Sequence, residues 1–398
     1  MLFQLIDNKI DCMGYCAAGK LFFEEELPEN LSKTWKYSSA LEGINSSRID
    51  FASLYCAGQS FEEVCPPHLQ DRLDIHTTKL KAFLRSFMEA KVSLDENCFF
   101  NLVPHKFLLS YYDIRNDITK YVFDNYQRPE NYMFLVRLTK VLEEIKRQPL
   151  NLDLSALRNQ AHNLAAKNFI QKVSQSKQIC DYNIFGTKTG RLTTKKGTFP
   201  ILTMDKKYRS VLKPTNDWFV EFDFNAAELR TILSLSNQKQ PREDIHAWNV
   251  KNIYNDRVTR DEAKKKIFAW LYNPNSTDNA PDKYYDKAFI EGMYYSNGVI
   301  STPFGRKIEA DSHHAINYLV QSTSSDNTLK QMYRLHSLLQ NCKSFVAFTM
   351  HDSVIIDLSH EEKDLIPLLA LTFSETALGN FEINISAGVD YGSMRELG

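Results

Sequence analysis

Two aspartates stand at the ends of apolar runs that predict buried strands. Asp223 lies near the end of WFVEFDF (218–224), and Asp352 separates the two apolar halves of FVAFTMHDSVIIDLS (345–359). Such runs indicate a strand and a hairpin. A carboxylate next to a buried strand is costly unless its charge is compensated. Taken singly, each aspartate also has an ordinary explanation, Asp223 as a helix cap and Asp352 as a turn residue.

Considered together, the two aspartates indicate a metal site. If the two strands are neighbours in one sheet, their carboxylates converge, and close carboxylates repel unless a cation lies between them. Hard oxygen ligands with few other partners suit Mg²⁺, which retains waters and binds substrate phosphates. Two such ions can activate an attacking oxygen and stabilise a leaving one. The pair therefore predicts phosphate chemistry at two magnesium ions.

A helix is predicted over TRDEAKKKIFAWLY, because Thr259 and Glu262 have the spacing of a capping box. Its side chains at four-residue spacing lie on one slowly winding stripe; they are Arg260, Lys264, Phe268 and Tyr272. The cationic half lies near the positive end of the helix and suits phosphates, and the aromatic half suits a base. The alternative is that the rings belong to the core and the cations to a solvated face.

The bulk composition excludes a globally basic nucleic-acid binder. The net charge is −1 over 398 residues, so any such surface must be local. One candidate is the segment 186–213, which has eight basic residues and a single acid, Asp205; it is either a solvated loop or a phosphate-contacting surface. The seven cysteines show no zinc-type spacing, which predicts free thiols and a cytoplasmic protein.

Six short motifs, in order along the chain, resemble family A, polymerase-I-like DNA polymerases. DFNAAELR (223–230) is similar to the first palm motif, RDEAKKKIFAWLY (260–272) to the fingers-helix motif, and HDS (351–353) to the second palm motif. The other three matches are TGRL (189–192), DIH (244–246) and INYLVQSTSSD (316–326). They cover residues 180–398, and the helical hairpin expected before them fits a thumb.

The resemblance implies an α+β, right-hand polymerase fold with an antiparallel palm sheet and helical fingers and thumb. The implied domains are an N-terminal domain (1–122), thumb (123–180), first palm part (181–240), fingers (241–315) and second palm part (316–398). The N-terminal domain carries none of the motifs and is expected to be an α/β exonuclease-like or docking domain. It contains no Asp-x-Glu, so no 3′–5′ proofreading exonuclease is expected.

The resemblance also implies a role for each matching side chain. Asp223, Asp352 and the backbone carbonyl of Phe224 would hold two Mg²⁺ ions at a primer 3′ end. Lys264 would also be the acid for the leaving pyrophosphate. The dNTP would contact a larger set: Arg260, Lys264, Phe268, Tyr272, Glu228 and His246. Within that set, Glu228 would be the steric gate against ribonucleotides, and Phe268 would lie against the sugar. Primer-template DNA would contact Arg191, Asn317, Gln321 and His351.

Three positions depart from the family pattern. NAAELR lacks the polar residue that often precedes the gate Glu, Asn273 replaces a Gly, and Ser353 replaces a Glu. None of them removes a predicted metal ligand, so an active, compact, phage-type enzyme is expected. The alternatives are a catalytically weak polymerase-like DNA-binding protein and an RNA-synthesising relative, which Glu228 disfavours. A processivity factor or a separate exonuclease as further partners is left open, and no membrane span is expected.

Overall fold

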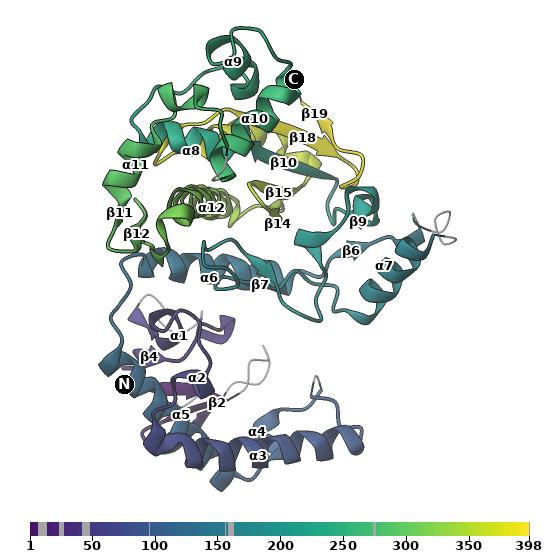
Figure 1. The fold of residues 1–398 in the computed structure, drawn as a ribbon. Helices are drawn as coiled ribbons and strands as arrows, with labels where there is room; N and C mark the ends of the chain where they lie inside the picture. The colour runs from purple at the N-terminus through teal and green to yellow at the C-terminus, as the bar shows by residue number, and fades with distance from the viewer. Residues whose placement is uncertain are drawn as a thin grey trace. The chain divides into compact units, whose positions relative to one another are not determined.

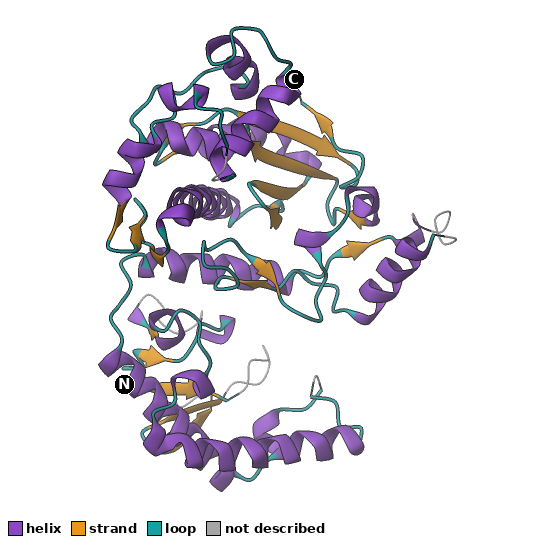
Figure 2. Ribbon diagram, viewed as in Figure 1, coloured by secondary structure: helices purple, strands orange, loops and turns teal. Residues whose placement is uncertain are grey.

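The computed structural model describes residues 1–6, 14–23, 28–41, 48–94, 96–155, 157, 163–273 and 276–397. The chain divides into two compact units, Met1–Glu143 and Glu144–Gly398, called unit 1 and unit 2 below. Both combine helices with small, mostly antiparallel sheets (Figures 1 and 2). The predicted α+β class is therefore confirmed.

Unit 1 joins a three-stranded antiparallel sheet to two long helices. The sheet has the order β1-β2-β3, with β1 (Phe3–Leu5), β2 (Gly14–Ala17) and β3 (Lys20–Phe23). The long helices α3 (Pro67–Glu89) and α5 (His105–Asn125) lie against each other around a core that includes Leu69, Leu73 and Ile114. The shorter elements are β4 (Lys33–Thr34), β5 (Asp50–Phe51), α1 (Ala52–Tyr55), α2 (Phe61–Val64) and α4 (Phe99–Leu102).

Unit 2 is built on a five-stranded antiparallel sheet in the order β14-β15-β10-β18-β19 (Figure 1). The strands are β10 (Trp218–Phe224), β14 (Phe345–Met350), β15 (Ser353–Leu358), β18 (Ile383–Gly388) and β19 (Arg395–Glu396). The strand and the hairpin predicted around the two aspartates are confirmed, and β10 pairs directly with β15. Alternation along β10 gives the sheet two different faces.

One face of β10 is apolar, and the other carries the charged residues. Phe222 and Phe224 are buried and approach Phe373 of α13 (Ile366–Ser374), with ring centroids 6.0 and 4.3 Å apart. Glu221 and Asp223 alternate with them and therefore project from the opposite face. The packed side fixes the register of the strand, since a shift by one residue would bury both carboxylates.

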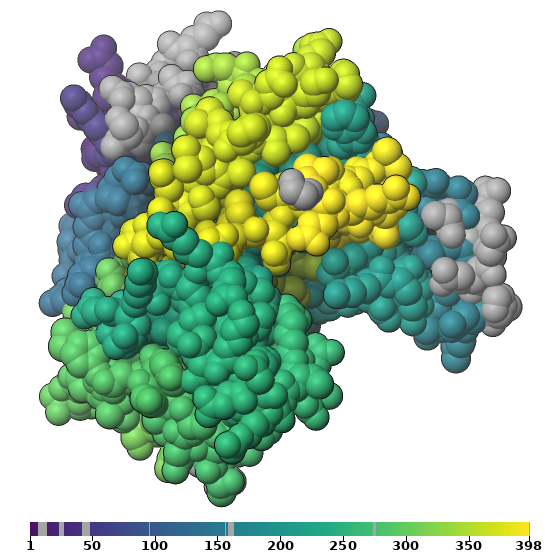
Figure 3. Space-filling view, turned by 90° about the horizontal axis from the view of Figure 1, so that it is seen from above, coloured from purple at the N-terminus to yellow at the C-terminus, as the bar shows by residue number. Residues whose placement is uncertain are grey.

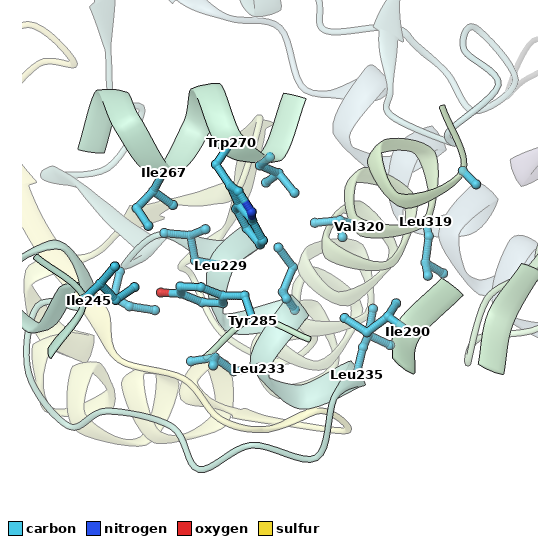
Figure 4. Packing of buried hydrophobic residues seen from close by; sticks show 14 of the residues in the cluster. Leu229, Leu233, Leu235, Ile245, Ile267, Trp270, Tyr285, Ile290, Leu319 and Val320 are labelled. Atoms are coloured by element: carbon cyan, nitrogen blue, oxygen red, sulfur yellow. The ribbon is translucent and has the colours of Figure 1, made fainter. Parts of the chain in front are cut away.

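The helices of unit 2 share an apolar core shown in Figure 4. It includes Leu229 of α8 (Ala227–Leu235), Trp270 of α10 (Arg260–Tyr272) and Val320 of α12 (Ser312–Leu339). Two polar groups in this core are satisfied: Trp270 Nε1 donates to Asp282 at 2.8 Å, and Tyr285 OH donates to Asn249 at 2.7 Å. The core therefore holds α10 in a defined orientation.

The remaining elements of unit 2 are short. The helices are α7 (Leu164–Gln175), α9 (Ile245–Asn252) and α11 (Lys287–Tyr294). The strands are β6 (Asn151–Leu152), β7 (Tyr182–Asn183), β8 (Thr193–Thr194), β9 (Leu212–Lys213), β11 (Tyr295–Ser296), β12 (Val299–Ser301), β13 (Lys307–Glu309), β16 (Glu375–Thr376) and β17 (Gly379–Asn380). None of the described helices combines the length and hydrophobicity needed to cross a bilayer.

Two local expectations are wrong in part. The predicted hairpin of helices at 130–148 and 152–175 keeps its first helix, α6 (Tyr132–Arg147), but the second begins only at Leu164. Asn151 and Leu152 instead pair with β9, a partner 60 residues away that local periodicity does not reveal. Cys98 is disulfide-bonded, whereas a free thiol was expected; the described free thiols are Cys16, Cys56, Cys65, Cys180 and Cys342.

Candidate active site

The two aspartates lie at adjoining strand ends of unit 2. Asp223 is directly opposite Ser353 in the β10–β15 register, and Asp352 immediately precedes Ser353. Both carboxylates line a cleft of about 850 Å³ together with Arg260 and His351. The convergence predicted from the sequence is present.

The cleft electrostatics disfavour two ionised carboxylates. Burial, followed by the charges of Asp352 and Glu221, raises the pKa of Asp223 to about 7. Burial also raises the pKa of Asp352, and the charge of Glu228 adds to the shift. Each shift has the sign expected when acids are crowded without a compensating cation.

The hairpin turn that carries Asp352 is held from both sides. His351 adopts a left-handed backbone conformation (φ 55°), which is uncommon for a side-chain-bearing residue and costs on the order of 1 kcal/mol. Thr349 Oγ1 donates to the Ser353 carbonyl at 2.7 Å, and Tyr182 OH donates to the Thr349 carbonyl at 2.8 Å. These contacts bridge the turn and fix the direction in which Asp352 leaves the sheet.

The predicted capping box of α10 is present: Thr259 accepts from the Glu262 amide, and Glu262 accepts from the Thr259 amide at 2.8 Å. It starts the helix at Arg260, whose guanidinium makes two hydrogen bonds to Asp244, at 3.0 and 2.7 Å. Burial alone would raise the pKa of Asp244, but the hydrogen bonds from Arg260 and from the Ala247 amide hold it well below its usual range. Arg260 is thus anchored at the cleft.

Three rings follow one another along α9 and α10. His246 lies 6.1 Å from Phe268, and Phe268 stacks on Tyr272 with centroids 5.9 Å apart. Burial lowers the pKa of His246 to about 4, although Asp244 opposes the shift, and the positive charge of Lys264 adds to the lowering. His246 is therefore neutral near pH 7, and its Nδ1 has no hydrogen-bond partner among the described residues.

Lys264 is exposed on α10. The described residues that line the cleft do not include Lys264. The structure therefore brings Arg260 to the aspartates but leaves Lys264 one helical turn further along the same stripe. Figure 3 shows the surface of the 240–310 segment (green) beside the C-terminal strands (yellow) that line the cleft from the other side.

A second cleft of about 790 Å³ also borders the hairpin turn. His351 and Asp352 line it as well, together with Arg191 and Glu228. Glu228 accepts hydrogen bonds from Arg191 and from the Tyr272 hydroxyl. Burial and the adjacent Glu228 raise the pKa of Tyr272, so its hydroxyl remains a donor. Glu228 therefore links α10 to the loop that carries Arg191.

The two amides predicted to contact DNA lie one helical turn apart on α12, where the Gln321 amide donates to Asn317. Further along α12, Asp326 is fully buried and pairs with Arg306 at 2.6 and 3.0 Å. A Cβ on Gly190 would lie only 2.4 Å from the Arg306 guanidinium, so a side chain there would displace it. This ion pair therefore supports the loop that carries the neighbouring Arg191.

Sequence patterns missed several side chains around the aspartates. Glu221, Asn384 and Tyr391 all line the larger cleft. The alternation of WFVEFDF already placed Glu221 on the same face as Asp223, and this signal could have found it. Asn384, opposite Asp223 on β18, and Tyr391 carried no motif.

The donor set of the cleft suits a hard cation. It consists of carboxylate oxygens whose raised pKa values mark uncompensated repulsion, and such a site favours an ion that binds oxygen. Among the described residues, no group of three or more acids, histidines or cysteines has the arrangement of a closed metal cage. Magnesium, which usually takes one or two protein carboxylates and completes its shell with water and phosphate, fits this open arrangement.

Comparisons with known proteins agree with these observations. No protein-family model matches the chain. It is 25% identical to the DNA polymerase of Mycobacterium phage D29 over 37% of this chain, and the match spans 32% of that relative, about a third of its length. The fold is similar to the POL domain of Pol1 from M. smegmatis in complex with DNA primer-template and dNTP (TM-score 0.66, 12% identity, 96% of this chain and 92% of that one). The predicted polymerase fold is confirmed, and the resemblance to family A is supported.

Proposed function

We propose that this chain is a template-directed DNA polymerase of the polymerase-I-like family that adds dNTPs to a primer 3′ end. One observation carries the proposal: Asp223 and Asp352 meet at adjoining strand ends, in a cleft that Arg260 of the motif-bearing helix also lines. The polymerase fold and the sequence match to a phage DNA polymerase support it.

The carboxylates of Asp223 and Asp352, with the backbone carbonyl of Phe224, are the groups that would hold two Mg²⁺ ions. When bound, these ions would neutralise charge on the attacking primer oxygen and on the departing pyrophosphate. The chain itself contributes positioning, because both aspartates are fixed by paired strands whose opposite face is packed. Such positioning would favour in-line approach of a primer 3′-hydroxyl to the α-phosphate.

The residues on the fingers side would bind the triphosphate. Arg260 and Lys264 supply positive charge near the N-terminus of α10, where phosphates are favoured. His246, kept neutral by burial, would donate or accept a hydrogen bond without adding charge. Lys264 is also proposed to protonate the leaving pyrophosphate, since an ammonium can give up a proton as negative charge develops.

The aromatic end of the stripe would face the nucleoside. Phe268 would lie against the sugar, and Tyr272 would lie near the templating base. Glu228, fixed by its hydrogen bonds to Tyr272 and Arg191, would block a ribose 2′-hydroxyl. A half-buried acceptor in a fixed position excludes an added hydroxyl better than a mobile one, which supports a DNA product.

Primer-template DNA is proposed to lie along the second cleft. Arg191 and His351 line it. Gln321 is hydrogen-bonded to the Tyr272 hydroxyl. Asn317 and Gln321 carry amide donors suited to the minor-groove acceptors shared by all base pairs. The basic residues Lys195 and Lys196 also line this cleft and would contact the phosphate backbone.

A primer-extension assay tests the proposal. The protein is offered primer-template DNA, Mg²⁺ and either dNTPs or rNTPs; extension with dNTPs is expected, and its loss in Asp223→Ala and Asp352→Ala with DNA binding retained. No extension by a folded protein would refute the proposal. It would favour the second candidate, a catalytically weak polymerase-like DNA-binding protein, which Ser353 in place of an acid favours. Degradation of a single-stranded 3′ end would refute the absence of proofreading.

A further inference from the structure

The proposed magnesium site has two carboxylates, and Ser353 stands beside them where the family pattern has a further acid. We propose that Glu221 supplies the third negative charge, from β10 instead of from position 353. The inference rests on the proposed function, because it assigns a residue to the same metal site. Glu221 would act as a positioning residue that attracts the ion and orders its water.

The strand register places Glu221 beside the candidate ligands. It precedes Asp223 by two residues on β10, so both side chains leave the same face of the sheet. Ser353 is directly opposite Asp223 and therefore diagonal to Glu221. All three line the larger cleft, and the charge of Glu221 is one of the causes that raise the pKa of Asp223.

Two buried hydroxyls fix the Glu221 carboxylate. Ser353 Oγ donates to Glu221 Oε1 at 2.9 Å, and Tyr391 OH donates to the same oxygen at 3.1 Å. Hydrogen bonds to a charged acceptor are among the stronger ones in proteins. Both engage Oε1, which leaves Oε2 for a water on the cation.

The Tyr391 hydroxyl is aimed by its surroundings. The ring packs edge-on against Phe348 and Phe219, with centroids 5.3 and 6.4 Å apart. The guanidinium of Arg209 lies over the same ring, 4.7 Å from its centroid. Tyr391 is 2% exposed and Ser353 is 3% exposed, so water competes little with either hydroxyl for the Glu221 carboxylate. Together these contacts hold the Tyr391 hydroxyl in the direction of the Glu221 carboxylate.

This arrangement explains why position 353 holds a serine and not a glutamate. A glutamate at that position would place a second carboxylate against Glu221, and like charges so close repel. A serine instead donates a hydrogen bond to Glu221. The acid and its hydroxyl partner therefore stand on opposite strands from those of the family pattern, and the proposed magnesium site has Glu221 beside Asp223 and Asp352. Since the described acids do not form a closed cage, Glu221 would act through a metal-bound water.

Binding of Mn²⁺ to the full chain, without DNA or dNTP, tests this assignment. Free Mn²⁺ is measured by electron paramagnetic resonance for the native protein, Glu221→Gln and the control Glu396→Gln. Glu396 lines the same cleft but makes no contact with Ser353 or Tyr391 among the described hydrogen bonds. Glu221→Gln is expected to weaken Mn²⁺ binding about tenfold, as for other outer-shell partners of a metal, and the control to weaken it less than twofold.

Two further variants test whether the position of the acid matters, and their folding is checked separately. Ser353→Ala removes the hydroxyl that contacts both Glu221 Oε1 and the Met350 carbonyl, each at 2.9 Å, and is expected to weaken Mn²⁺ binding a few-fold. The exchange Glu221→Ser with Ser353→Glu returns the acid to the place the resemblance predicts and should restore most of the affinity. Melting curves followed by circular dichroism verify that each variant is folded.

The outcomes distinguish this inference from the proposed function. If the native protein extends primers and Glu221→Gln binds Mn²⁺ as the native protein does, the role of Glu221 is refuted and the polymerase proposal stands. If Glu221→Gln and the control weaken binding equally, the effect is general charge, and the specific assignment is wrong. If the native protein neither binds Mn²⁺ nor extends primers, both are wrong.

Discussion

The charge of Asp223 should destabilise the metal-free protein at neutral pH. Burial and the neighbouring Asp352 raise the pKa of this carboxyl to about 7. The unfolded chain has the ordinary value near 4, so between about pH 4 and pH 7 the folded state holds a proton that the unfolded state has lost. Stability contributed at this site therefore falls as pH rises through that window. Asp223→Asn removes the ionisation while keeping the shape.

The magnitude follows from the size of the shift. A displacement of roughly three pKa units corresponds to about 4 kcal/mol at pH 8, which is a ceiling because the site can relax and admit water. We expect about half of this, or about 2 kcal/mol. For a unit of this size, that is a rise in Tm of about 4–8 °C for Asp223→Asn at pH 8. Near pH 4 the two proteins should melt together.

Melting in EDTA at pH 4 and pH 8 measures the effect. The control is Asp364→Asn, which removes the same charge from an exposed position in unit 2. Added Mg²⁺ should raise the Tm of the native protein at pH 8 more than that of Asp223→Asn, since the ion supplies the missing compensation. If Asp223→Asn and Asp364→Asn change the Tm equally at pH 8, the argument from burial and repulsion is wrong.

Three further predictions follow from the charged pairs. Arg260→Ala should raise the KM for dNTP about tenfold or more through loss of a charged phosphate contact, while the exposed Arg257→Ala changes it little in the same steady-state extension assay. Glu228→Ala should increase ribonucleotide incorporation about tenfold relative to dNTPs, and unchanged selectivity would remove the gate. Asp326→Asn leaves Arg306 buried without its carboxylate and should cost about 3–5 kcal/mol in urea unfolding; a loss below 1 kcal/mol would contradict a structural role for the pair.

Local sequence was sufficient where the signals were local. The alternation of WFVEFDF, the two-residue turn at His351 and Asp352, and the capping box at Thr259 all predicted elements that the structure confirms. In each case the residues that determine the element lie within a few positions of one another. The convergence of two aspartates 129 positions apart followed from a single added assumption, that their strands are neighbours.

Sequence reasoning failed where the deciding partner is distant and has no motif. The hydrogen bond from Ser353 to Glu221 joins residues 132 positions apart, and nothing near Ser353 signals it. Likewise, β6 forms only because β9 lies beside it, so the helical periodicity around Leu152 was overridden. Polar residues of α12 such as Asn327 are buried, and polarity alone would place them at the surface.

Each of the two arginines proposed to bind substrate already forms an ion pair with a carboxylate of the protein. Arg260 is bound by Asp244, and Arg191 by Glu228, so neither cation is free in the protein alone. A phosphate entering beside Arg260 must share the guanidinium with Asp244, and this exchange offsets part of the gain in binding. The same pairing orders both side chains before a substrate arrives, which lowers the entropy lost on binding. Such a site would discriminate by geometry, because only a triphosphate that meets Arg260 and the aspartates, together with DNA that meets Arg191, would recover the cost of separating the two ion pairs.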